Sequence, residues 1–122
     1  MATRIGRIEV RWGETCRVRI YITDQDGAPL DCTGCTARFA VSKYRDSATK
    51  DLEYPNTDGR FSLVNGDGTN DVLQWALNAD DTVAVARYMS HWDCRMTLAD
   101  RTKVVVEGPY VVLGSPTYEA PP

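Results

Sequence analysis

Cysteine, aspartate and histidine are the residues of this sequence that could do chemistry, and their spacing decides which chemistry each could support. Cys32-Thr33-Gly34-Cys35 has the two-residue spacing of a metal knuckle or a redox motif. A structural zinc site needs four ligands, and the chain has no second close pair of cysteines. We therefore interpret Cys32 and Cys35 as buried thiols, with metal binding and redox activity as the alternatives.

Cys16 and Cys94 lie on two separate predicted strands, in the inward phase of each, as the bridging pair of antibody domains does. Two residues that accompany this cysteine pair in antibody domains, a tyrosine and a tryptophan, are absent here. Trp92 stands where the tyrosine before the second cysteine is expected, and Phe39 stands where antibodies carry tryptophan. Whether the two thiols are neighbours stays open here, and a bond is disfavoured because a reducing cytoplasm keeps cysteines reduced.

Oxygen-bearing side chains occupy alternate positions of one loop, as in a calcium-binding loop: Asn65, Asp67, Thr69 and Asp71. The match is partial, because Asn70 replaces the glycine at the sixth position and Ala76 replaces the glutamate at the twelfth. Glycines between polar residues are also what tight turns require. We expect a turn here and keep these four residues only as weak metal candidates, with no cofactor assigned.

His91 is the sole histidine of the chain, and it falls on the outward face of its predicted strand, where we expect a solvated residue. Asp80 and Asp81 could serve as paired carboxylates for acid and base catalysis. Their place at the start of a short helix explains them more simply, because carboxylates are stabilised at a helix N-terminus. We therefore expect no catalytic residue and no enzyme.

Trp12, Trp75 and Trp92 could form a stacking platform for a sugar, since aromatic rings bind the apolar faces of carbohydrates. All three fall in the inward phase of their strands. Core packing is therefore the preferred interpretation, and a carbohydrate or host-surface binding module remains an alternative.

Apolar and polar residues alternate along eight short segments, which indicates half-buried strands separated by turn residues. The predicted strands span residues 8–12, 16–22, 37–44, 50–53, 61–63, 73–77, 88–98 and 103–113. Asn78 caps one short helical turn near residues 79–85, and Gly108-Pro109 suggests a bulge or an edge position in the last strand. This pattern predicts an antiparallel β-sandwich of seven to eight strands, with a β-barrel as runner-up.

The chain has 122 residues, which suits one domain, and its average apolar and charged fractions indicate a globular protein. Its net charge of −3 and its scattered lysines and arginines argue against nucleic acid as a partner. No segment is apolar enough for a signal peptide or a membrane span, so we expect a protein made in the cytoplasm. We divide it into a domain at residues 1–114 and an extended, proline-rich tail at residues 115–122.

The segment from Asp26-Gly27 through Pro29, Asp31 and Thr33-Gly34 to Phe39 resembles a signature of immunoglobulin-like domains in bacteriophage tail and baseplate proteins. The N-terminal domain of baseplate upper proteins is the named example. The resemblance continues through residues 72–82, 88–98 and 106–112, and Cys32 and Cys35 depart from it by replacing leucine and alanine.

This resemblance implies an immunoglobulin-like β-sandwich and a virion structural protein of a phage or prophage, assembled in the bacterial cytoplasm. The implied partners are other virion proteins, with homo-oligomers in the particle and no membrane. A tail, baseplate or neck component is expected, with a capsid decoration protein as the alternative. The ends of the chain lack an apolar period and are our interface candidates, as arms that order on assembly: Ala2, Thr3, Arg4, Pro116, Thr117, Tyr118, Pro121 and Pro122.

Overall fold

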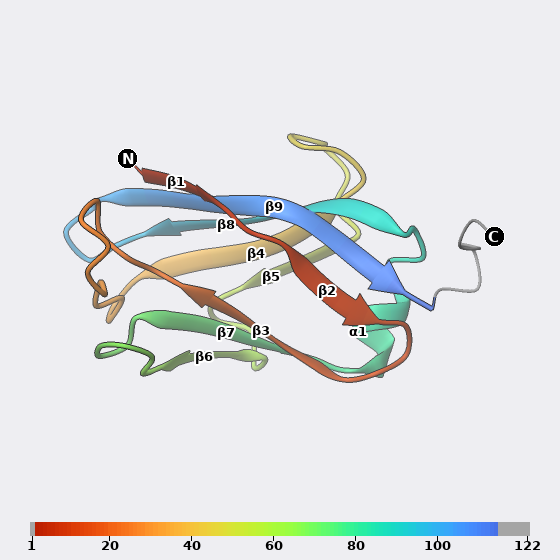
Figure 1. Ribbon diagram of the computed structural model, residues 1–122, viewed down its shortest axis with the longest axis horizontal. Helices are drawn as coiled ribbons and strands as arrows, with labels where there is room; N and C mark the ends of the chain where they lie inside the picture. The colour runs from red at the N-terminus through yellow and green to blue at the C-terminus, as the bar shows by residue number, and fades with distance from the viewer. Residues whose placement is uncertain (1, 115–122) are drawn as a thin grey trace.

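The computed structural model describes residues 2–114, with the backbone alone for residues 2–5, and contains two packed β-sheets and one short helix (Figure 1). The large sheet holds β1 (Ala2–Ile5), β2 (Ile8–Arg11), β4 (Thr36–Ser42), β5 (Leu52–Pro55), β8 (Met89–Thr97) and β9 (Lys103–Leu113). The small sheet holds β3 (Cys16–Tyr21), β6 (Phe61–Val64) and β7 (Val72–Leu77). The helix α1 spans Ala79–Val83.

The order of the strands identifies the fold. In the large sheet the order is β1-β9-β8-β4-β5, with β2 also paired to β9, and in the small sheet it is β3-β7-β6. The chain passes several times from one sheet to the other. Two packed sheets connected in this way form an immunoglobulin-like β-sandwich. The predicted fold class is therefore confirmed, and the barrel is excluded because two separate sheets enclose the core.

All eight predicted strands are present, with ends that differ from the predicted ones by at most two residues. A ninth strand, β1, was not predicted from the sequence. Its backbone pairs with β9 from Ala2↔Val104 to Ile5↔Glu107, so the proposed N-terminal arm of Ala2, Thr3 and Arg4 is part of the sheet in the isolated chain. The predicted tail at residues 115–122, with its five interface candidates, lies outside the described residues.

The pairing of β1 and β2 with β9 is parallel, whereas every other strand pair in the described residues is antiparallel. β1 and β2 keep one register along β9 and are separated opposite Gly108-Pro109. The carbonyls of Glu107 and Leu113 accept hydrogen bonds from the N-terminal segment. Alternate residues of a strand direct their backbone groups to the same neighbour, so Pro109 also faces the N-terminal segment. Proline has no N–H to donate, and the pairing is therefore interrupted at this position. The predicted bulge or edge is thus wrong: β9 is a central strand, and the interruption lies in its partner.

A close backbone approach accompanies this interruption. The carbonyl oxygen of Gly6 accepts a hydrogen bond of 3.1 Å from the indole nitrogen of Trp92, which lies on the far side of β9. The path between them crosses Gly108, and a Cβ atom there would lie 1.4 Å from the Gly6 oxygen. Only glycine fits at position 108, because the Gly6 carbonyl occupies the space that a side chain would need.

One core lies between the sheets, and its largest fully buried side chains include Trp75, Tyr110 and Phe39. The ring centroids of Phe39 lie 5.6 Å from those of Trp75 and 6.1 Å from those of Trp92, in tilted arrangements that aromatic pairs favour. Trp75 and Trp92 are buried as predicted, and Trp12 packs half-buried against the core.

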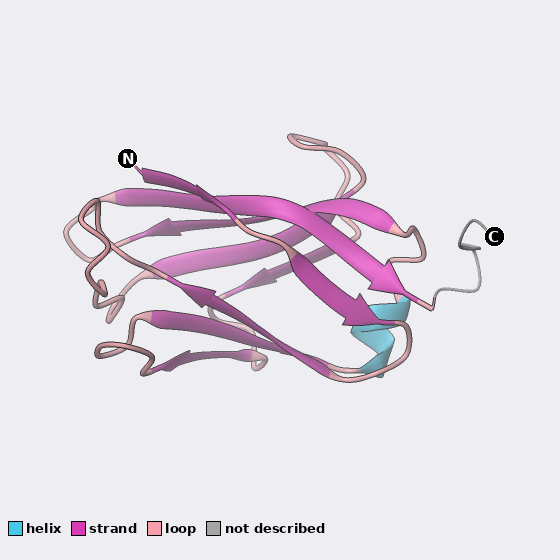
Figure 2. Cartoon of the chain, viewed as in Figure 1, coloured by secondary structure: helices cyan, strands magenta, loops and turns pink. Residues whose placement is uncertain are grey.

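The helix α1 closes one end of the sandwich between β7 and β8 (Figure 2). Asn78 accepts a hydrogen bond from the Asp81 amide, and the Asp81 carboxylate accepts one from the Asn78 amide, which forms a capping box. The predicted cap is thereby confirmed, and the helix is two residues shorter than predicted. The Thr82 hydroxyl ties the helix to the β2–β3 turn by donating to the Glu14 carbonyl at 3.0 Å.

Candidate functional site

The outer face of the large sheet is not covered by another layer of the described residues. The small sheet and α1 lie on its inner side, and the loop of residues 43–51 curls over one part of the outer side (Figures 1 and 2). Strand alternation places the side chains of Arg38, Arg95 and Val105 on this outer face, opposite to buried Phe39, Cys94 and Val106. A surface of this kind is available to a partner.

Three cavities on this face share lining residues and form a row of adjoining hollows, which we call the outer furrow. The largest, of about 610 Å³, shares Arg95 and Val105 with a middle cavity of about 210 Å³. The middle cavity shares Arg45, His91 and Glu107 with a third cavity of about 440 Å³. The furrow therefore follows β8 and β9, as a bound extended polypeptide would.

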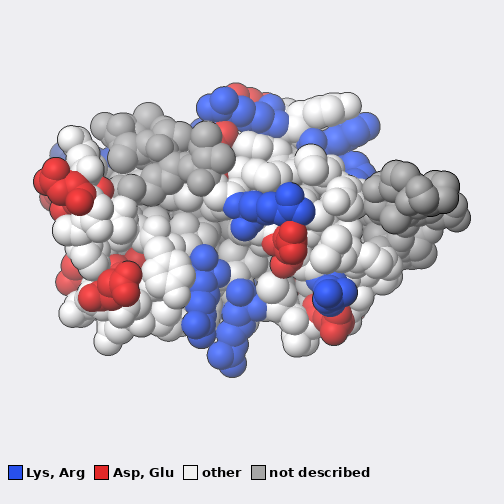
Figure 3. Space-filling model, viewed as in Figure 1, with Lys and Arg blue, Asp and Glu red and all other residues white. Residues whose placement is uncertain are grey.

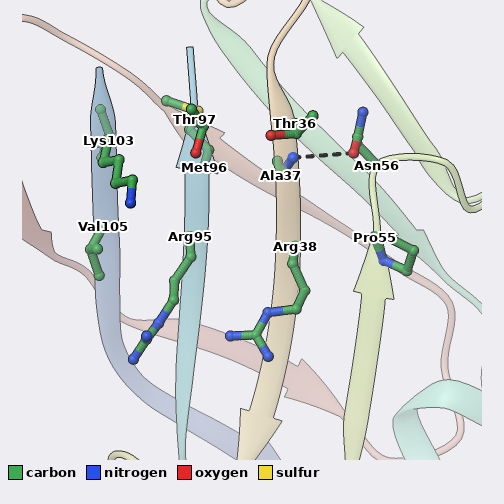
Figure 4. Close-up of a pocket in the computed structure, with 11 residues that line it drawn as sticks. Thr36, Ala37, Arg38, Pro55, Asn56, Arg95, Met96, Thr97, Lys103 and Val105 are labelled. Carbon is green, nitrogen blue, oxygen red and sulfur yellow. Dashed lines mark hydrogen bonds between the residues drawn. The ribbon is translucent and has the colours of Figure 1, made fainter. Parts of the chain in front are cut away.

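Three cations from neighbouring strands line the largest part of the outer furrow: Arg38 on β4, Arg95 on β8 and Lys103 on β9 (Figure 4). No carboxylate lines this part. Thr36, Asn56 and Thr97 add polar groups, and the Asn56 amide oxygen accepts a hydrogen bond of 3.1 Å from the Ala37 amide. This end of the furrow is suited to a ligand that carries carboxylates.

Ion pairs hold the two arginines of this end in place. Arg38 pairs with Glu53 and lies 3.6 Å from Asp93, and Arg95 reaches Asp93 at 3.3 Å and Asp46 at 3.2 Å. No ion pair in the described part of the chain involves Lys103, whose side chain is exposed. Lys103 is therefore the cation at this end whose charge is not already matched by a carboxylate.

The buried carboxylate of Glu107 lines the middle of the outer furrow, together with Arg45 and His91. Arg45 lies 2.9 Å from this carboxylate and His91 lies 3.3 Å from it. The His91 side chain is 20% exposed, so the expectation of an outward residue is right, but the residue is partly buried and paired. One oxygen of Asp93, Oδ1, is buried without a hydrogen-bond partner in the described residues and lies 3.6 Å from the Arg38 guanidinium.

The far end of the outer furrow is more apolar. Met89 is 54% exposed there and Pro109 lines the same cavity. The furrow thus changes from cationic at the start of β9 to apolar near the start of β8, which gives a bound segment a preferred direction.

The weak calcium candidates Asn65, Asp67, Thr69 and Asp71 lie in a turn, and two of them accept hydrogen bonds from its backbone amides. The Asp71 carboxylate is buried and accepts hydrogen bonds from the amides of Gly66 at 2.7 Å and Asp67 at 3.1 Å, and these bonds lower the pKa of Asp71. Asn65 accepts a bond from the Asn70 amide. These side chains stabilise a turn, and the described residues contain no group of three or more histidine, cysteine or acidic side chains placed to bind a metal.

The four cysteines are free thiols. Cys32 and Cys35 are buried as predicted, and they are joined by a tight turn in which the Cys35 amide donates to the Cys32 carbonyl at 3.0 Å. Burial, reinforced by neighbouring Cys35, raises the pKa of Cys32 to about 12, so its thiol stays protonated. Cys94 packs in the same core as these two, whereas Cys16 is half-buried at the start of β3.

A buried ionic cluster around Asp81 was missed by the sequence analysis. Arg60 binds Asp81 at 2.9 Å and Asp58 at 3.0 Å, lies 4.3 Å above the Tyr54 ring, and Tyr54 donates to Asp81. Burial and the bond to Asp81 raise the pKa of Tyr54 to about 12. Asp80 is exposed, so the two adjacent carboxylates do not act as a pair. The cluster joins the start of β6 to α1 and is structural.

Comparisons with known proteins were made by sequence and by structure. No protein-family model and no curated protein matches the sequence. The chain is similar to a solved structure described as "Dpr1 IG1 bound to DIP-eta IG1", with 10% identity, 90% of each chain covered and a TM-score of 0.48. It is also similar to extracellular domains 3–5 of Drosophila OTK, with 14% identity, 90% of this chain and 34% of that chain covered, and a TM-score of 0.40.

A search of the described residues for membrane-spanning helices finds none of the required length and hydropathy.

Proposed function

We propose that this protein is a bacteriophage virion structural protein, a tail, baseplate or neck component that acts by binding neighbouring proteins and catalyses no reaction. The observation that carries the proposal is the outer furrow, a row of adjoining hollows along β8 and β9 on the outer face of the large sheet. The sequence resemblance to tail and baseplate domains supports the setting. The immunoglobulin-like fold alone does not assign it, because one fold hosts many functions.

The occupant that fits the outer furrow is an extended segment of a neighbouring virion protein. Carboxylates of that segment would lie beside Lys103 and Arg38, and apolar side chains would lie beside Met89 and Pro109. Burial of contact area supplies the affinity, and the cations at one end fix the direction of the segment.

The carbohydrate-binding alternative loses its motive, because it depended on exposed tryptophans. Trp75 and Trp92 are 0% and 2% exposed, and Trp12 packs against the core. Capsid decoration remains the second candidate, since the same furrow would serve a capsid neighbour equally well.

The test is to locate and count this chain in separated heads and tails of the phage that encodes it. We expect it in tails, at a small symmetric copy number. Its presence over the whole capsid would favour decoration, and its absence from purified particles would overturn the proposal.

A matched pair of variants tests the furrow itself. Val105→Asp places a charge on the half-buried floor of the outer furrow, whereas Ala76→Asp places the same charge on the exposed outer face of the small sheet. We expect Val105→Asp to lower incorporation into particles at least tenfold and Ala76→Asp to leave it unchanged, with both variants folded by circular dichroism. Equal incorporation would exclude the furrow as the docking site.

A further inference from the structure

Charged side chains are segregated on this molecule although the net charge is only −3. The loops that connect β3 to β4, β6 to β7 and β8 to β9 meet at one end of the sandwich, which Figure 3 shows with acidic side chains gathered on it. Six aspartates belong to these loops, accompanied by the single cation Arg101. Asp71 is buried, and the other five lie at the surface: Asp24, Asp26, Asp31, Asp67 and Asp100. We call this surface the acidic end.

Contacts between the loops fix the acidic end as one surface. The Asn70 side chain donates to the Thr33 hydroxyl at 2.9 Å, and the Cys32 amide donates to the Asn70 carbonyl at 3.0 Å. Gly34 lies beside Ala99 of the third loop. The five carboxylates are therefore held together in the folded chain.

One part of the acidic end is a short hairpin between Thr23 and Pro29, which form an isolated bridge. Asp24 stabilises its turn by accepting hydrogen bonds from the amides of Asp26 and Ala28. The Asp26 side chain is exposed at the tip, and its carboxylate has no partner in the described part of the chain. The tip is thus a preformed, negatively charged projection.

Four exposed arginines form a complementary surface along β2, β3 and the residue before β2: Arg7, Arg11, Arg17 and Arg19. We call this surface the arginine edge, and Figure 3 shows basic side chains gathered over these strands. Glu9 pairs with Arg7, and Arg19 bonds the neutral side chain of Gln74. Arg11 and Arg17 form no ion pair with any other described residue.

The arginine edge also has a concave part. A crevice of about 240 Å³ opens where β1 ends and β2 begins, lined by Arg7, Arg19 and Tyr21 with Trp92 at its base. A projecting acidic turn and a crevice flanked by two arginines are complementary in shape and in charge. Within one chain the two surfaces adjoin at Tyr21, whose ring lies beside Gly66 of the β6–β7 loop.

We propose that copies of this chain associate with each other, with the acidic end of one copy against the arginine edge of the next. A reciprocal pair of such contacts gives a closed two-fold dimer, whereas a single contact repeated from copy to copy gives a ring if the rotation closes and a filament if it does not. Exposed ion pairs are individually weak and are screened by salt. The association is therefore expected at high protein concentration and low ionic strength, and this inference does not depend on the outer furrow.

Two charge-reversed variants of the purified full chain test the proposal by sedimentation velocity at low salt. Arg11→Glu/Arg17→Glu reverses the charge of the edge, and Asp26→Lys/Asp31→Lys/Asp67→Lys reverses the charge of the end, and all five side chains are exposed. We expect the wild type to sediment as multiples of its 13.6 kDa mass, and to become monomeric in high salt. Each variant alone should be monomeric, because its two surfaces then carry charge of the same sign.

Mixing the two variants restores opposite charges at every contact and should restore association, an outcome that misfolding or loss of net charge would not produce. Lys43→Glu/Lys50→Glu, which reverses two charges on the β4–β5 loop, is the matched control and should associate as the wild type does. A monomeric wild type at low salt and high concentration, undiminished association of either variant, or failure of the mixture to associate would overturn the proposal. None of these outcomes bears on incorporation through the outer furrow, so the two proposals fail separately.

Discussion

The four cysteines differ in access to solvent, and this difference predicts their reactivity. Cys32, Cys35 and Cys94 are buried, whereas Cys16 is half-buried at the start of β3. Burial raises the pKa of every one of them, which slows reaction at neutral pH because the thiolate is the nucleophile.

We expect a thiol reagent such as DTNB to modify one cysteine slowly in the native protein and all four after denaturation. Cys16→Ser should abolish the native reaction and leave three reactive thiols in denaturant. Rapid native reaction of a second thiol would contradict the burial of the Cys32-to-Cys35 turn.

Asp81 is a buried carboxylate whose ionisation contributes to stability. Burial alone would raise its pKa, but hydrogen bonds from Arg60, Tyr54 and the Asn78 amide outweigh burial and lower it. A carboxyl whose pKa is lowered by folding stabilises the native state above its unfolded pKa of about 3.9, and this stabilisation is lost as pH falls through the folded value.

We therefore expect Asp81→Asn to lower the free energy of unfolding at pH 7 by about 2 kcal/mol, below the usual cost of breaking a buried pair because the Arg60 side chain is 30% exposed. The loss should shrink below pH 4, where the wild type also loses the charge. Urea unfolding at several pH values measures both effects. Asp80→Asn, at an exposed position, is the control, and an Asp81→Asn loss that stays constant down to pH 2 would contradict the ionic role.

Sequence alone predicted the place of Asp81 at the helix start but not its partner. Capping is a local pattern of a few residues, so Asn78 and Asp81 could be identified from spacing. Arg60 lies 21 residues earlier and reaches Asp81 only because the β6–β7 hairpin brings the start of β6 beside α1. Nothing in the spacing of the two residues indicates that contact.

The crossing of Gly6 over Gly108 predicts an unusually intolerant position in β9. We expect Gly108→Ala to lower the free energy of unfolding by about 3 kcal/mol, because the new methyl group would displace the Gly6 carbonyl and break its bond to Trp92. Gly59→Ala, where no atom lies near the added methyl group, should change it by less than about 0.5 kcal/mol. Equal effects of the two substitutions in urea unfolding would refute this account of the crossing.

Eight of the strands were predictable from the sequence, whereas the parallel pairing of the N-terminal segment with β9 was not. Alternation of apolar and polar residues decides which side of a strand is buried, and it identified eight strands correctly. It does not name the partner, so the parallel pairing of β1 and β2 with β9, about a hundred residues away, had no local signal. Gly108-Pro109 was the one visible trace of it, and it was interpreted as a bulge or an edge.

The outer furrow and the arginine edge were invisible in the sequence for a related reason. The arginines looked scattered along the chain, but β2 and β3 bring four of them to one side of the molecule. Lys103, Arg95 and Arg38 likewise come from three strands that are neighbours only in the folded sheet. Surfaces of this kind depend on the register between strands, which only the folded molecule provides.

The molecule should unfold as one cooperative unit, since a single core contains residues from both sheets. Trp75 and Trp92 lie on opposite sheets of that core, so their fluorescence reports on both. We expect fluorescence and far-ultraviolet circular dichroism to give the same urea midpoint. Two separate midpoints would mean that the sheets come apart independently.

The parallel pairing of the two ends of the described chain also decides how the molecule bears a pulling force. β1 and β2 run alongside β9 in the same direction, with residue 2 near one end of the sandwich and residue 114 near the other (Figure 1). A force that separates these two points slides the strands along each other and loads their hydrogen bonds together instead of one after another. Pro109 divides the hydrogen bonds to β9 into one set with β1 and another with β2. Under tension the β1 set can therefore break while the β2 set still joins the N-terminal segment to β9.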